Sequence, residues 1–409
     1  MVMRKGALPE KLYMISMAIA FSMEVNNVAL PFFLKYGIAI FWIIIAIIQN
    51  KGRISDRDVR IMKLFSIPMI VAFVYTIVIW IVNTPEGVNF SYFSRLVSNL
   101  GCMVVIAVCA VMMCSLFGKR VVYLSFYALI ITIGYNFVIV LREYGTASMV
   151  EYLKNVFSLS QFEYGSIISN ISYGLEVHDA TFAMGIFLVY FIFYEDKNEN
   201  RRLLHIILAL VCSYLGFKRN EMLAIIVVTI VALIFVRKKS KDFLKTSQFL
   251  GFGMFIIGMA YTILIKNIDI LPVFVKILDI ARINLYHFLS EQYTISPFYL
   301  GKGFSYINHR LGFESKLLDT SHTDLVRVYI EMGIYGFGLW IWYYFVNIPR
   351  KLYREYSETA AKFFLIGTFY VFSTYFLDNT LTLFDNQFIY YLIPLALCYK
   401  DQNLETIEI

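Results

Sequence analysis

The feature that most constrains this chain is a series of apolar runs, each close to the ~20 residues that an α-helix needs to cross a bilayer. Hydrophobic residues make up 59% of the chain and charged residues only 16%, well below the share of about a quarter that is usual in soluble domains. The runs lack the alternation that membrane β-barrels require. The sequence therefore predicts an all-α polytopic membrane protein.

About twelve spans fit the hydropathy, and we expect residues 1–409 to form one membrane domain. The first run lacks the exit of a cleavable signal peptide, so we expect it to be retained as a span. The expected spans are 12–30, 32–49, 64–83, 96–117, 121–141, 179–194, 203–217, 221–236, 248–266, 326–347, 361–378 and 386–399.

Lysines and arginines indicate how these spans are oriented. Most of them fall in short segments at every second connection, such as 51–63, 197–202 and 237–245. Because short basic segments stay in the cytoplasm, both termini are predicted to be cytoplasmic. This placement explains the formal net charge of +7, so we expect no nucleic-acid partner.

The two longest polar segments are then extracytoplasmic. Residues 142–178 form a first outward loop, and residues 267–325, between the ninth and tenth spans, form what we call the large loop. A structureless connection of that length is unusual, so we expect the large loop to be ordered and functional. Within it, the apolar stripe of Pro272–Gln292 predicts an amphipathic helix that lies in the membrane interface.

The cysteines and acidic residues indicate neither a metal site nor a cofactor. All five cysteines lie inside apolar runs and form no C-x-x-C pair, so neither a disulfide framework nor a zinc site is expected. The outward loops also lack an Asp-x-Asp motif, which disfavours a metal-dependent transferase that uses nucleotide sugars.

The first candidate cluster is the turn Gly216-Phe-Lys-Arg-Asn-Glu221, between two spans that are short for a bilayer. Short spans place the turn near the depth of lipid phosphates. There, Lys218 and Arg219 are suited to bind a diphosphate, because a guanidinium fork matches phosphate oxygens well. The simpler interpretation is a charged hairpin turn in which Glu221 neutralises one cation.

The second cluster lies in the large loop. Arg282 is on the predicted amphipathic helix, where it either binds a phosphate or only extends to the membrane interface. Gly301-Lys-Gly303 follows it. Lys302 of this stretch, Arg142 of the first outward loop and His178 at the outer mouth of the sixth span are further candidate substrate-binding residues.

The third cluster surrounds the entry to the tenth span. Asp324, Arg327 and Glu331 have the spacing i, i+3 and i+7, so they share one helix face. They either neutralise one another or bind substrate. His322 precedes them, and a neutral imidazole there is suited to take a proton from a sugar hydroxyl. A helix cap is the simpler interpretation of His322.

Together these clusters resemble the O-antigen and capsular polysaccharide polymerases, the Wzy-type members of the O-antigen ligase superfamily. Phe217-Lys-Arg-Asn-Glu-Met-Leu223 looks like the family's Ser-Arg-Gly-type turn, with Lys218 and Asn220 in place of Ser and Gly. Arg282 followed by Pro297-Phe-Tyr-Leu-Gly-Lys-Gly303 is similar to its Arg…Pro-Leu-x-Gly-x-Gly stretch. His322-Thr-Asp-Leu and Glu331-Met-Gly-Ile-Tyr-Gly336 are similar to its entry into a late span.

The resemblance implies a metal-independent, inverting glycosyltransferase in the bacterial cytoplasmic membrane, with its active site facing outward. The donor would be a polyprenyl-diphosphate-linked glycan, and the acceptor a second lipid-linked repeat unit. Arg219 and Arg282 would hold the diphosphate, and His322 would orient or deprotonate the acceptor hydroxyl. Membrane lipids, a chain-length regulator and a flippase are the further partners that the resemblance implies.

Two other functions stay open. A ligase that transfers finished glycan shares the fold and the residues, and only the sparse motifs favour a polymerase. A transporter or lipid flippase of about twelve spans would show two matching halves with spans broken by Gly and Pro. The chain has only 8 prolines, and the large loop has no counterpart in its first half.

Overall fold

The computed structural model describes residues 7–22, 33–83, 90–155, 171, 178–195, 201–215, 219–236, 242–268, 280–314, 323–376 and 378–399. The chain forms two compact units. The first comprises Met1–Val59, Val105–Val236 and Leu383–Ile409, and the second comprises Arg60–Val104 and Arg237–Thr382. Every regular element in the described part is helical, which confirms the predicted all-α class.

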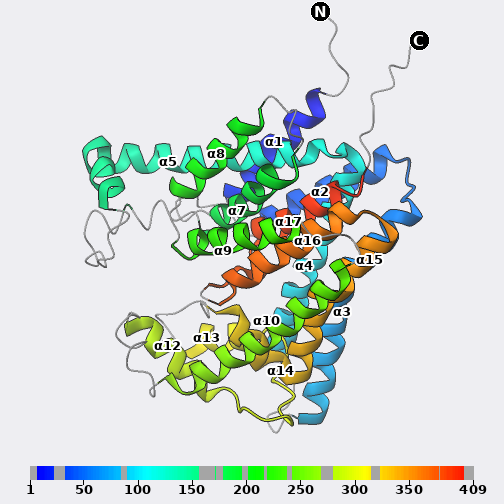
Figure 1. Ribbon diagram of the computed structural model, residues 1–409, viewed down its shortest axis with the longest axis vertical. Helices are drawn as coiled ribbons and strands as arrows, with labels where there is room; N and C mark the ends of the chain where they lie inside the picture. The colour runs from blue at the N-terminus through cyan, green and yellow to red at the C-terminus, as the bar shows by residue number, and fades with distance from the viewer. Residues whose placement is uncertain are drawn as a thin grey trace, which may run out of the picture. The chain divides into compact units, whose positions relative to one another are not determined.

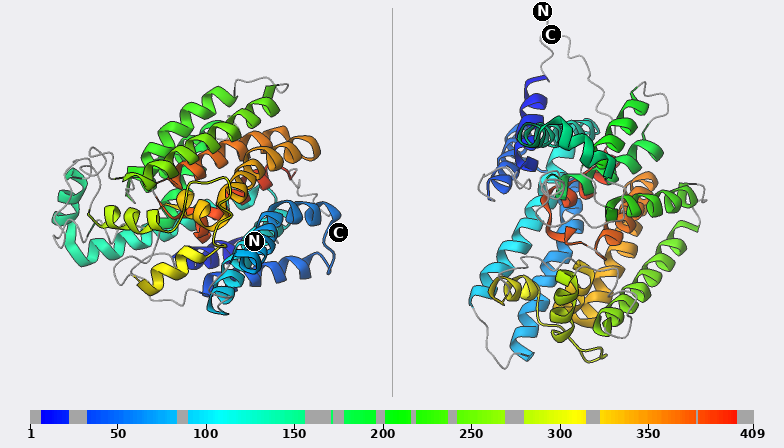
Figure 2. Two further views of the ribbon diagram at one scale, coloured as in Figure 1. Left: turned by 90° about the horizontal axis from the view of Figure 1, so that it is seen from below. Right: turned by 90° about the vertical axis from the view of Figure 1, so that its left-hand side faces the viewer.

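The first unit is a bundle around α17 (Phe384–Ala396), which is buried on all sides. A helix that is apolar around most of its circumference needs such a position. α7 packs against α8, α9 and α17, and α1 packs against α5 (Figures 1 and 2). The other helices of this unit are α1 (Ala7–Ser22), α2 (Leu34–Gln49), α5 (Arg120–Asn155), α7 (His178–Phe193), α8 (Arg202–Leu215) and α9 (Arg219–Val236), with the last part of α4 (Phe90–Phe117).

The second unit is centred on α14 and α16. α10 packs along α14, and α12 packs against α10 (Figure 1). The Ser357 hydroxyl caps α16 by accepting from the Ala360 N–H over 3.3 Å. This unit contains most of α3 (Asp56–Asn83), the first part of α4, α10 (Phe243–Lys266), α12 (Ile280–Glu291), α13 (Tyr306–Glu314), α14 (Asp324–Trp342), a π-helix (Tyr343–Asn347), α15 (Ile348–Glu355) and α16 (Glu358–Thr374).

Several helix faces fit a lipid environment. Among the described residues, four helical segments are long and apolar enough to cross a membrane: Asp56–Val82, Tyr92–Phe117, Arg120–Lys154 and Phe243–Lys266. On α3, the exposed side chains include Ile70, Val74, Val78 and Ile81, which recur along one helix face. Such a continuous apolar face is unfavourable in water and matches hydrocarbon. These features support a polytopic membrane protein.

The structure corrects the predicted count of twelve spans. The apolar helices α2, α7, α8 and α9 fall outside the group that meets the length and composition of a span. The predicted span 386–399 corresponds to α17, which has 13 residues. The predicted span 326–347 contains a break in α14 at Gly333. Hydropathy records how apolar a stretch is, but not where its helix begins, breaks or ends, so the count was too high.

The polar segments contain more helix than expected. α5 continues to Asn155, with a break at Gly145, so the segment predicted as the first outward loop starts as helix. The large loop holds α12 and α13. The amphipathic helix predicted over 272–292 is observed as α12, and the preceding residues 269–279 lie outside the described part. Leu285 and Leu289 of α12 are buried, and this helix packs on α10.

Candidate functional site

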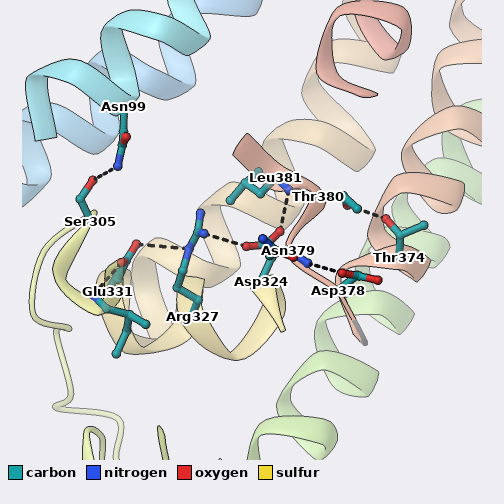
Figure 3. A network of polar contacts seen from close by, with 11 residues as sticks. Asn99, Ser305, Asp324, Arg327, Glu331, Thr374, Asp378, Asn379, Thr380 and Leu381 are labelled. Atoms are coloured by element: carbon teal, nitrogen blue, oxygen red, sulfur yellow. Dashed lines mark hydrogen bonds and ion pairs between the residues drawn. The ribbon is translucent and has the colours of Figure 1, made fainter. Parts of the chain in front are cut away.

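Three ionisable side chains form a buried network on the first two turns of α14 (Figure 3). Arg327 Nη1 lies 2.9 Å from Asp324 Oδ1, and Arg327 Nε lies 3.9 Å from Glu331 Oε2. All three side chains are buried. The predicted common helix face is confirmed, and the distances favour mutual neutralisation over substrate binding. A buried charge needs such partners because its removal from water is costly.

The turn that follows α16 holds the start of α14. The Leu381 N–H donates to Asp324 Oδ2 over 2.6 Å, and the Asp324 N–H donates to the Asp378 carbonyl over 3.2 Å (Figure 3). The Thr374 and Thr380 hydroxyls, 2.7 Å apart, tie this turn to the end of α16. No role was predicted for this turn. Its run of polar residues between two predicted spans was the available signal.

A break in α14 explains the glycine-rich stretch of the large loop. Gly333 has a φ of 63°, which favours glycine, and a Cβ there would lie 2.3 Å from the backbone of segment 299–303. We call this segment the docking loop. The break leaves the Glu331 carbonyl open to it, and that carbonyl accepts from the Gly303 N–H over 2.7 Å. The Gly-x-Gly stretch therefore serves close packing against α14.

Lys302 lies on the docking loop beside an aromatic side chain. Its Nζ donates to the Tyr306 hydroxyl over 3.2 Å and lies 4.8 Å from the centroid of that ring. The Tyr306 hydroxyl in turn donates to Gln292 Oε1 over 3.1 Å. Lys302 is half-buried, so its position and charge are compatible with the predicted contact to an anionic substrate.

Arg282 lies on a helix that is linked to the start of α14 through Tyr261. It is half-buried on α12, and the hydroxyl of Tyr286 on the same helix lies 3.4 Å from the hydroxyl of Tyr261 on α10. The Tyr261 hydroxyl donates to the Phe376 carbonyl over 2.6 Å, and the neighbouring Tyr375 carbonyl accepts from the Leu325 N–H of α14 over 3.1 Å. Tyr261 therefore links the helix that carries Arg282 to the turn that holds the start of α14, where Thr323 follows His322.

His309 of α13 is a buried histidine that was not among the predicted site residues. Its ring packs against Tyr92. Burial, together with the charges of Arg95 and Arg310, lowers the pKa of His309 and keeps the imidazole neutral near pH 7. A neutral imidazole can accept a proton, which makes His309 a second candidate base in the large loop. A lone histidine in a polar helix gives no sequence signal for this role.

The other predicted site residues are distributed over the chain. Arg219 begins α9 and His178 begins α7, both in the first unit, and their side chains lie outside the described part. Arg142 is exposed on α5. Lys218 and His322 lie outside the described residues. The roles assigned to these residues stay predictions.

The first unit also buries polar side chains that were not predicted as site residues. Glu221, two residues after Arg219, is fully buried at the start of α9. His205 Nδ1 lies 2.9 Å from Glu195 Oε1, and its Nε2 lies 2.9 Å from the Tyr127 hydroxyl. Asp385, Asn386 and Gln387 are buried at the start of α17. An ionisable residue inside an apolar helix costs free energy to bury, so its presence in an apolar run of the sequence could have identified these residues as candidates.

Among the described residues, no group of three or more His, Cys, Asp or Glu side chains is arranged to hold a metal ion. The chain matches no protein-family model, no curated protein and no solved structure. The function is therefore inferred from the residues and the geometry described above.

Proposed function

We propose that the chain is a glycosyltransferase that polymerises oligosaccharide repeat units carried on a polyprenyl diphosphate, as in the synthesis of O-antigen or capsule. The observation that carries this proposal is the link that Tyr261 makes between α12, the helix of Arg282, and the turn that holds the start of α14. From this link we expect Arg282, a candidate phosphate ligand, to lie near the candidate base His322, which precedes α14. A cation and a base in proximity are what glycosyl transfer from a diphosphate needs.

The surrounding contacts support a rigid site. The start of α14 is fixed by the Leu381 and Asp378 contacts to Asp324, and its break is fixed by the docking loop. The ion pairs of Arg327 with Asp324 and Glu331 fix the three side chains on one face of α14. Rigid elements lower the entropic cost of reaching the transition state, because the catalytic groups are already in position.

In the proposed reaction, the oxygen of an acceptor hydroxyl attacks the anomeric carbon of the donor glycan. The bond from that carbon to the diphosphate breaks, and attack from the opposite face inverts the anomeric configuration. The hydroxyl proton passes to His322. The electron pair leaves with the diphosphate, whose growing charge Arg282 and Arg219 stabilise, with Lys302 as a further cation.

The membrane setting is compatible with a lipid-linked substrate. We place the shorter apolar helices α2, α7, α8 and α9 in the bilayer as well, with both termini in the cytoplasm and the large loop outside. The site then faces the outer leaflet of a bacterial cytoplasmic membrane. A flippase that delivers repeat units and a regulator of chain length are the proposed partners.

Single alanine substitutions test the three assigned roles. Arg282→Ala and Arg219→Ala are each expected to lower the rate of chain extension by roughly 10²–10³, the usual loss when a group that stabilises developing negative charge is removed. His322→Ala is expected to lower it by roughly 10²–10⁴, the usual contribution of a general base. The measurement is extension of purified lipid-linked repeat units by each variant in nanodiscs.

Arg120→Ala is the matched control, because Arg120 forms an exposed ion pair with Glu10 and should leave the rate unchanged. Full activity of all three test variants at normal membrane levels contradicts the proposed site. His309→Ala distinguishes the two candidate bases: a large loss there, with full activity of His322→Ala, transfers the role of base to His309.

A further inference from the structure

The second unit contains an apolar cavity of about 320 Å³ between α3, α4 and α14. Its wall includes Ala72 of α3, Met103 of α4, and Met332 and Trp340 of α14. The volume lies near the lower end of the ~300–1,000 Å³ that small-molecule sites occupy. A cavity with such a lining stays dry and favours an apolar guest.

One end of the cavity is shaped by a proline. Pro68 lies inside α3, and because it has no N–H it cannot donate to the Leu64 carbonyl. The Tyr343 hydroxyl donates to that carbonyl instead, over 2.9 Å. Pro68 and Tyr343 both line the cavity. This contact joins α3 to the π-helix that follows α14.

The opposite end adjoins the polar site. Phe304 and Leu381 both line the cavity. The guanidinium carbon of Arg327 lies 6.0 Å from the centroid of the Phe304 ring, and the Leu381 N–H is bonded to Asp324. Tyr75, also in the lining, donates its hydroxyl to the Leu300 carbonyl of the docking loop over 3.0 Å. The cavity therefore runs from an apolar end to the loop that carries Lys302.

The rim of the cavity fits contact with lipid. α3 and α4 each contain a segment suited to cross a membrane. On α14, the lining residues Tyr335, Leu339 and Trp342 are 60%, 48% and 45% exposed, and their spacing of i, i+4 and i+7 places them on one face. In a membrane such a face contacts the bilayer hydrocarbon. An amphiphile can therefore enter the cavity from the bilayer with its apolar chain first.

We infer that this cavity holds the isoprenoid chain of the lipid carrier next to its phosphate end. This assignment rests on the proposed function, which supplies a polyprenyl-linked donor. Met69, Met103 and Met332 line the cavity, and flexible thioether side chains adapt to a guest with methyl branches. Lys302 on the docking loop supplies a cation near the end of the cavity where the anionic head of the carrier would lie.

The test uses a long-chain polyprenyl phosphate that carries a diazirine on its first isoprene units, with the full-length protein in phosphatidylglycerol nanodiscs. After irradiation, mass spectrometry should place the label on cavity residues such as Ala72, Met103 and Met332. Unlabelled polyprenyl phosphate should compete, whereas excess phosphatidylglycerol should not.

Ala72→Trp should fill the cavity and lower labelling by about tenfold, as expected if roughly two buried methylene groups lose their contacts. Ala72→Phe is the smaller change for the case in which the tryptophan variant fails to fold. Val78→Trp is the control, because Val78 is an exposed apolar residue of the same helix outside the lining. It should leave labelling within about twofold of wild type, a difference of less than ~0.5 kcal/mol.

Equal labelling by a diazirine phospholipid at the same residues, or labelling unchanged in both Ala72 variants, overturns the inference. Photolabelling measures binding of the carrier, and glycan extension measures the transferase reaction, so the two proposals are tested separately. A wild-type protein that binds the probe in the cavity but extends no glycan leaves the carrier site standing and refutes the proposed transferase.

Discussion

Arg327 is the residue on which the buried polarity of α14 depends. It lies between two fully buried carboxylates, 2.9 Å from Asp324 and 3.9 Å from Glu331. Removal of the central cation would leave two buried acids without their compensating charge. The i, i+3 and i+7 spacing was enough to predict a shared face. The Leu381 N–H that completes the site lies 57 positions away, and no local pattern could have revealed it.

Arg327→Met should therefore reduce the free energy of unfolding by about 3–5 kcal/mol, the usual cost of breaking a buried ion pair. A triple variant that also carries Asp324→Asn and Glu331→Gln should recover part of this loss, because no buried charge remains. Denaturant unfolding in detergent measures both. Arg120→Ala, in an exposed pair, should cost less than ~1 kcal/mol. Unchanged stability of Arg327→Met with complete loss of glycan transfer would show instead that Arg327 binds substrate.

α14 is the element that positions the site, and its break is as important as its length. Gly333 adopts a positive φ, and its backbone meets the docking loop closely enough to exclude any side chain. The sequence predicted one continuous span here, because the apolar pattern continues across the glycine. The sequence did mark the glycines themselves, but their partner is a loop about 30 residues earlier in the chain, which periodicity cannot identify.

Gly333→Ala should reduce the free energy of unfolding by about 2 kcal/mol or more, from the left-handed backbone and the contact with the docking loop. Gly253→Ala is the control, because a Cβ at this position on α10 meets nothing within 4 Å. It should be neutral or stabilising by up to ~1 kcal/mol. Thermal unfolding in detergent compares the two variants. Equal stability of both variants would contradict the close packing of α14 on the docking loop.

At the scale of the whole molecule, the chain builds each of its two units from segments that are far apart in sequence. Composition was sufficient for the all-α membrane class, because apolar content depends only on residue type. The count of spans and the division into units depend on helix breaks and on contacts between distant segments, which hydropathy does not contain. Arg219 belongs to the first unit and Arg282 to the second.

The most direct test of the proposed glycosyltransferase is the length of the product that the purified wild-type protein makes from lipid-linked repeat units alone, in nanodiscs. The proposal predicts a ladder of products that grow by one repeat unit at a time, each still attached to one polyprenyl diphosphate. Transfer that occurs only after a different acceptor is added would indicate a ligase. Movement of the repeat unit across the bilayer without a new glycosidic bond would contradict glycosyl transfer and indicate a transporter.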